Sequence, residues 1–288
     1  MTTRRIGIAH LTLLDLTPPE VVTTAAAAGF DFVGIRVKAA TAGETPFPME
    51  PGSAMSKETQ LRLSDTGLTV QDIEFLTLDA HVTADDWLPA LAAGAALGAS
   101  TISVVGADPD RGRLLATLAL LVEHGREFGI RPTLEPISYQ LVSTVEEAAE
   151  LARATGAAVL LDALHLQRGG STVDQVRALD ASLVPILQLC DAPFDTPAHL
   201  DVPAFMPRGM TTNGSVLQLE ARAVRLPAGH GGLPLGELLT AVDSETPLSV
   251  EVPNGHLRAT MDALSFARLN REAVQRIVES LTESLDEG

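Results

Sequence analysis

The sequence is poor in cysteine and in aromatic residues, and each shortage limits what the protein can be. Its 288 residues include one cysteine, Cys190, so no disulfide can form within the chain, and a reducing compartment is expected. Aromatic residues make up only 3% of the chain, so Ala, Leu and Val must fill the core. Because 45% of the residues are apolar, residues 1–288 are expected to form one large domain with a substantial core.

Positive charge is scarce as well. The chain has 20 Lys and Arg against 37 Asp and Glu, which gives a formal net charge of −17. Such a field repels nucleic acid and anionic membrane surfaces, so a small molecule is the expected partner. The N-terminus lacks an apolar signal segment. The uncharged run 87–107 is interrupted by Pro89, Gly94 and Gly98, and it predicts a helix followed by a strand rather than a membrane span. We therefore expect a soluble, cytoplasmic protein.

Several catalytic motifs are missing. A Schiff-base mechanism needs a lysine at the end of a strand, but Lys38 and Lys57 both lie by a predicted loop. The sequence also contains no Gly-x-Ser-x-Gly nucleophile elbow and no P-loop. These absences argue against aldolase-type, serine-hydrolase and nucleotide-phosphate chemistry.

Strands and helices alternate along the chain. Eight apolar strand segments are each followed by a helical segment, and an irregular Pro- and Gly-rich stretch covers residues 192–234. This alternation implies a parallel sheet, and eight units indicate a single (β/α)8 TIM barrel. A doubly wound open sheet would need a Gly-rich turn after the first strand, where the chain has His10-Leu-Thr-Leu-Leu instead. The predicted strands are 5–10, 30–37, 69–75, 101–105, 131–135, 158–162, 185–191 and 248–251, and the predicted helices are 17–29, 57–64, 85–97, 112–128, 144–155, 172–183, 235–242 and 259–285.

Polar residues stand at the ends of predicted strands 5 to 8. These residues are Glu135, Asp162, Gln188 and Glu251. In a βα-barrel the carboxyl ends of the strands meet at one mouth, so three acids and one amide would share a small volume. Each residue alone fits a helix cap or a salt bridge, but together their repulsion is relieved most simply by a divalent cation. All-oxygen ligands suit Mg²⁺ or Mn²⁺, while Zn²⁺ and Co²⁺ stay open.

Other candidate residues surround these ends. His165 follows Asp162 by three residues and fits either a proton shuttle or a helix-start histidine bonded to backbone. His10 ends the first strand and is a candidate for substrate contact. Arg36 ends the second strand and can pair either with an anionic group of the substrate or with Glu74.

Two arginines stand out in the irregular stretch of this acidic chain. Arg222 and Arg225 lie three residues apart, so they can share one face of a helical turn and clamp a carboxylate or phosphate. His230 lies in the glycine-rich sequence that follows and is a further candidate for substrate binding. The alternative is a solvated loop with a surface salt bridge to Glu220.

The strand ends resemble those of a known family, the xylose isomerase-like TIM barrels, often called sugar phosphate isomerases/epimerases. The likeness covers nearly the whole chain and rests on Ala28–Ile35, Leu134–Pro136, Leu161–His165, Gln188–Asp191 and Val250-Glu251. It implies that the four strand-end residues bind the divalent metal. Many members have His at the position of Gln188. The DNA-repair branch is excluded because it needs a histidine-rich zinc site and a basic surface.

The chain is also similar to bacterial 3-dehydroshikimate dehydratases of this fold, in its metal-site residues and in the loop from Arg222 to Gly231. The resemblances imply a metal-dependent isomerase or epimerase acting on a small sugar or polyhydroxy ketone through a metal-stabilised enediolate, with Glu135, Glu251 or His165 moving the proton. Dehydration by a lyase is the alternative, and a non-catalytic sugar-binding barrel is an alternative of another class. A homo-oligomer is a further expectation from the family.

Overall fold

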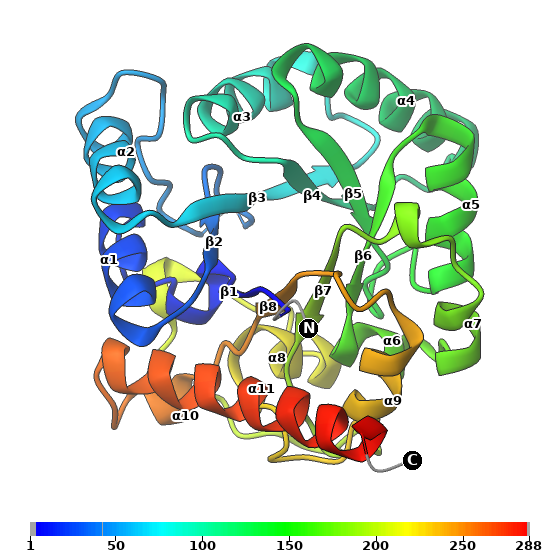
Figure 1. Cartoon of the computed structure of the whole chain (residues 1–288). Coiled ribbons are helices and arrows are strands. Elements are labelled where there is room, and N and C mark those ends of the chain that lie inside the picture. The colour runs from blue at the N-terminus through cyan, green and yellow to red at the C-terminus, as the bar shows by residue number, and fades with distance from the viewer. Residues whose placement is uncertain (1–3, 42, 287–288) are drawn as a thin grey trace.

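A computed structural model describes residues 4–41 and 43–286 of the chain. Its eight strands form a closed barrel in the order β1 to β8, every neighbouring pair is parallel, and β8 pairs with β1 through Ile6–Leu248 and Ile8–Val250. Figure 1 shows the strands at the centre with the helices around them. The predicted (β/α)8 barrel is therefore confirmed.

The strands and helices follow one another in the expected rhythm. The strands are β1 (Ile6–Ile8), β2 (Phe32–Arg36), β3 (Thr69–Leu78), β4 (Thr101–Gly106), β5 (Arg131–Glu135), β6 (Ala158–Asp162), β7 (Ile186–Leu189) and β8 (Leu248–Val250). The α-helices are α1 (Pro18–Ala28), α2 (Ala54–Thr66), α3 (Ala84–Ala96), α4 (Arg111–Phe128), α5 (Val145–Thr155), α6 (Ala163–Gly169), α7 (Val173–Arg177), α8 (Val216–Ala223), α9 (Leu235–Ala241), α10 (Gly255–Arg258) and α11 (Ala263–Asp286). Short 3-10 helices cover His10–Leu13, Ala181–Leu183 and Pro207–Gly209.

The interior of the barrel changes from apolar to polar along its axis. Phe32, Leu160 and Ile186 form a small buried cluster of their own. A Cβ atom on Gly7 would lie 2.2 Å from the Phe32 ring, so only glycine fits there. Because side chains alternate along a strand, Leu160 and Ile186 point to the same side as Asp162 and Gln188, two residues further on. The apolar cluster thus closes the barrel below a polar mouth.

Several local predictions differ from the structure. The irregular stretch 192–234 contains helix α8, which starts where the Ser215 side chain accepts a hydrogen bond from the Gln218 backbone N–H. The predicted helix 172–183 is divided into α7 and a 3-10 turn. The first strand ends earlier than predicted, so His10 begins a 3-10 helix.

The uncharged run 87–107 forms the end of α3 followed by β4, as predicted. None of the helices in the described residues is long and apolar enough to cross a membrane.

Candidate active site

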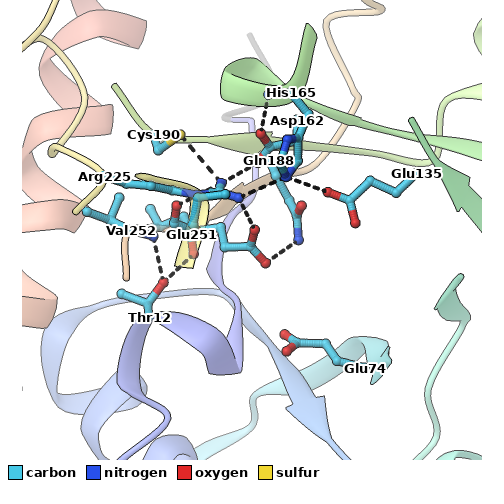
Figure 2. Close-up of polar contacts among 12 residues, drawn as sticks. Thr12, Glu74, Glu135, Asp162, His165, Gln188, Cys190, Arg225, Glu251 and Val252 are labelled. Carbon is cyan, nitrogen blue, oxygen red and sulfur yellow. Dashed lines mark hydrogen bonds and ion pairs between the residues drawn. The ribbon is translucent and has the colours of Figure 1, made fainter. Parts of the chain in front are cut away.

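The four predicted strand-end residues converge at the mouth of the barrel (Figure 2). Glu135 and Asp162 are the last residues of β5 and β6, Gln188 lies in β7, and Glu251 directly follows β8. All four side chains are buried, and one carboxylate oxygen from each of the three acids lies within 4.8 Å of the other two. The sequence-based prediction that these residues meet is therefore correct.

A guanidinium group shares this cluster. Arg225 Nη1 donates to Asp162 Oδ2 at 2.5 Å, and Arg225 Nη2 lies 3.1 Å from Glu251 Oε2. Nη1 also lies 3.5 Å from Cys190 Sγ, and Nε donates to the Ala221 carbonyl at 2.8 Å. The Arg225 side chain is only 2% exposed. The expectation of two arginines clamping one substrate anion is thus wrong for Arg225, because two carboxylates of the protein already hold it.

The backbone around Arg225 is fixed to the barrel mouth. Arg225 N donates to the Pro253 carbonyl at 3.1 Å, and the Asn254 side chain donates to the Arg225 carbonyl at 2.7 Å. An antiparallel bridge joins Leu226 to Asp191, which lies beyond the end of β7. With the backbone held in this way, the Arg225 side chain points toward Asp162 and Glu251 (Figure 2).

Three acids against one guanidinium leave an excess of negative charge. Burial raises the pKa of Glu135 well above its usual range, and Glu251 and Asp162 add to the rise. Burial also raises the pKa of Glu251 to about 8, although Arg225 opposes the shift. Burial acts in the same direction on Asp162, but Arg225 and the His165 amide outweigh it and hold the pKa of Asp162 below its usual range. Without a further cation, Glu251 therefore keeps its proton at neutral pH.

The donor set fits a divalent cation. Gln188 Nε2 donates to Glu251 Oε1 at 2.9 Å, which leaves Gln188 Oε1 buried without a hydrogen-bond partner within the described part of the chain. An unpartnered amide oxygen beside three carboxylates is a set of hard oxygen ligands. With Arg225 present, three ionised acids carry a net charge of about −2 at full ionisation, which a divalent ion would neutralise. Glu135, Asp162, Gln188 and Glu251 could thus hold such an ion.

His165 faces the same cluster from the start of α6. Its backbone N–H donates to Asp162 Oδ1 at 2.9 Å, so Asp162 caps this helix. The His165 ring has Nε2 at 3.4 Å from Arg225 Nη2 and at 3.9 Å from Glu135 Oε1, while Nδ1 lies 3.2 Å from Ser138 Oγ. Because Arg225 can only donate, these partners assign the ring proton to Nδ1 and an accepting lone pair to Nε2. Burial lowers the pKa of His165 to about 4, so the ring is neutral.

The opposite wall is an ion-paired network rather than a set of free substrate ligands. The predicted pair of Arg36 with Glu74 is present at 3.1 Å, and Glu44 pairs with Arg36 at the same distance. The His10 ring accepts from the Arg36 backbone N–H at 2.9 Å, contacts the Leu16 carbonyl at 3.0 Å, and stacks on Phe47. Both ring nitrogens of His10 are engaged, so His10 positions strand β2 instead of contacting substrate.

A cavity opens onto the cluster, and Glu135, Gln188 and Glu251 line it. Arg36 and Arg222 line it, but His230 is exposed and lies outside its walls. Sequence reasoning missed Tyr139 and Ser138, which lie close to His165. A signal was available, because Tyr139 is the only tyrosine of the chain and follows Glu135 by four residues.

The fold and the cluster define a TIM barrel with an acidic, oxygen-rich site at the carboxyl ends of its strands. The chain belongs to the xylose isomerase-like TIM barrel family, whose sequence profile matches residues 22–283. No curated protein sequence matches the chain.

Solved structures share the fold at low sequence identity. One is a xylose isomerase-like TIM barrel/4-hydroxyphenylpyruvate dioxygenase fusion protein, with 20% identity and a TM-score of 0.74 over 99% of this chain and 44% of that chain. Another is the IolI protein with a bound zinc atom, with 14% identity and a TM-score of 0.71 over 96% of this chain and 99% of that one. A third is the probable 3-DHS dehydratase AsbF of Bacillus anthracis, involved in petrobactin synthesis, with 12% identity and a TM-score of 0.69 over 94% and 98%.

Proposed function

We propose that the protein is a divalent-metal-dependent isomerase or epimerase acting on a small polyhydroxy ketone. The observation that carries this proposal is the convergence of Glu135, Asp162 and Glu251 at the wall of a cavity, beside Gln188, whose amide oxygen is buried and without a partner among the described residues. The family match and the zinc in the IolI structure support a metal ion in this position. The strongly acidic composition supports a small-molecule substrate in the cytoplasm rather than nucleic acid or a membrane.

The four strand-end residues would hold the ion, for which all-oxygen ligands favour Mg²⁺ or Mn²⁺ over Zn²⁺ or Co²⁺. When bound, it supplies Lewis-acid polarisation of a substrate carbonyl. The positive charge of Arg225 offsets the repulsion between the Asp162 and Glu251 carboxylates, and its contacts with both fix their orientation. The chain thereby preorganises its acids before substrate enters.

The same residues can move the substrate proton. Glu135 and Glu251 belong to the acid cluster and line the cavity, so either carboxylate, ionised once a cation is bound, could act as the general base. His165 is the third candidate for moving the proton, but its Nε2 contacts Arg225 Nη2 at 3.4 Å and burial lowers its pKa to about 4, so it can accept a proton only after that contact is broken. Removal of the proton next to the carbonyl and its return to the neighbouring carbon gives isomerisation, while its return to the opposite face gives epimerisation.

Dehydration is the second candidate. It begins with the same proton removal but ends with loss of the hydroxyl group on the β carbon. The amide ligand Gln188 and the structural likeness to the probable dehydratase favour it. A non-catalytic sugar-binding barrel is the alternative of another class, and it predicts neither bound metal nor proton exchange.

The proposal is tested by enolisation itself. Protein loaded with Mn²⁺ or Mg²⁺ is incubated in deuterated water with ketoses, an inosose and 3-dehydroshikimate, and the products are examined by NMR. We expect solvent deuterium next to the carbonyl of one substrate, and the product then distinguishes isomerase, epimerase and dehydratase. Absence of both exchange and bound metal in the purified protein would instead support the binding barrel.

Metal affinity should depend on pH. Glu251, whose pKa burial raises to about 8, holds a proton at neutral pH in the ion-free cluster, and a cation must displace it. The apparent affinity is therefore expected to rise between pH 6 and pH 8, by roughly tenfold per unit for each proton released, and to level off above the pKa of Glu251. Calorimetry in two buffers with different ionisation enthalpies measures the released protons. A pH-independent affinity would show that the cation binds elsewhere.

A further inference from the structure

Arg222 differs from the other arginines of the cavity. Arg36 and Arg225 are each held by two carboxylates of the protein. Arg222 has no carboxylate partner among residues 4–41 and 43–286; its Nη1 donates to the Thr211 carbonyl at 2.8 Å, and its side chain also interacts with the Tyr139 hydroxyl. The side chain is half-buried and lines the cavity. A guanidinium group in this setting retains donors for an anion that the protein itself does not supply.

Tyr139 links this guanidinium to the acid cluster. Burial raises the pKa of the Tyr139 phenol, Arg222 opposes the rise, and Glu135 adds to it, so the ring lies within electrostatic reach of both residues. It also meets the His165 ring edge-on, with 5.5 Å between the ring centroids. At neutral pH the phenol keeps its proton and can donate a hydrogen bond into the cavity.

We propose that Arg222 and Tyr139 form a subsite for a carboxylate group, so that the substrate is a polyhydroxy ketone that also carries a carboxylate. This inference rests on the proposed function, because it places the ketone at the acid cluster and the carboxylate at Arg222 and Tyr139, which line the same cavity. One guanidinium fork matches the two oxygens of a carboxylate. A phosphate dianion would bring a second negative charge beside Glu44, Glu74 and Glu135, while Arg36 and Arg225 are already paired.

The test compares two ring polyols that differ in the carboxylate. Binding of quinate and of myo-inositol to the Mg²⁺-loaded protein is measured by calorimetry for wild type, Arg222→Gln, Arg222→Lys and Tyr139→Phe. We expect wild type to prefer quinate, and Arg222→Gln to weaken quinate binding roughly 10- to 100-fold, as for a lost charge-assisted hydrogen bond, without changing inositol binding. Arg222→Lys should restore part of the loss. Arg276→Gln on α11, whose arginine is 59% exposed, is the matched control and should behave as wild type.

Three results would overturn the subsite. The first is equal binding of quinate by wild type and Arg222→Gln. The second is that wild type binds inositol as tightly as quinate. The third is that wild type binds inorganic phosphate more tightly than quinate. The outcome is separable from that of the proposed function. If deuterium exchanged into a neutral ketose equally well in wild type and Arg222→Gln, the proposed enzyme function would stand and the carboxylate subsite would not. If quinate binding depended on Arg222 but the protein bound no metal and catalysed no exchange, the subsite would stand and the proposed enzyme function would not.

Discussion

Replacing Arg225 with Ala is expected to lower the free energy of unfolding of the metal-free protein by about 3–5 kcal/mol, as for other buried ion pairs that lose one partner. The substitution leaves Asp162 and Glu251 buried without the guanidinium that now contacts both. A divalent ion should recover part of this loss, because it supplies positive charge to the same carboxylates. Urea denaturation with EDTA and with added Mg²⁺ measures both effects.

The chain offers a matched control for this prediction. Arg168 forms a second buried ion pair, with Nε and Nη2 at 2.7 and 2.8 Å from the Glu220 carboxylate. Arg168→Ala should destabilise the protein by a comparable amount, but added Mg²⁺ should not reverse it. If Mg²⁺ stabilised both variants equally, the cation would not be acting at the Arg225 cluster. If Arg225→Ala cost under about 1 kcal/mol, the cluster would be held together by protons rather than by the arginine.

Replacing Glu135 or Glu251 with Gln should reduce turnover by about 10²- to 10⁴-fold, the usual contribution of a positioned general base. The amide keeps the size and one oxygen of the side chain but cannot accept the substrate proton. The fold should be retained, because Gln also removes a negative charge from a crowded cluster. Solvent deuterium incorporation, measured by NMR on the substrate identified above, tests the activity, and elemental analysis measures the bound metal.

Glu150→Gln on α5, where the carboxylate is 73% exposed, is the control and should retain full activity. Full activity in both Glu135→Gln and Glu251→Gln would exclude these carboxylates as bases. His165 would then be the remaining candidate, since its Nε2 lone pair faces the cluster.

The sequence predicted the barrel and the four residues at its mouth because both depend on local order along the chain. Apolar runs of strand length identify the β-strands, and the parallel strands of a barrel must bring their carboxyl ends together. Glu135, Asp162, Gln188 and Glu251 therefore converge once the rhythm of strands and helices is known. The Arg36–Glu74 pair was predictable for the same reason, because β2 and β3 are neighbours and these two residues are paired in register.

The partner of the acids could not be predicted in the same way. Arg225 lies in a stretch without a repeating pattern, and its direction depends on contacts with Pro253 and Asn254, which follow the last strand. The sequence does not distinguish Arg222 from Arg225, whereas in the structure two carboxylates hold Arg225 and, among the described residues, none holds Arg222. His10 was misjudged because the strand ends before it, which turns its ring toward the Arg36 backbone.

Cys190 places an oxidisable thiol beside the acid cluster, in a position where it is buried. Its sulfur lies behind Arg225, 3.5 Å from Nη1 and with no exposed surface, and burial raises the pKa of the thiol. Because the sulfur has no exposed surface, an oxidant can reach it only when the packing around it opens. Cys190 is the one thiol of the chain, and its sulfur packs against the arginine that contacts the acids. Oxidation of Cys190 would therefore identify molecules in which the packing at the barrel mouth had opened.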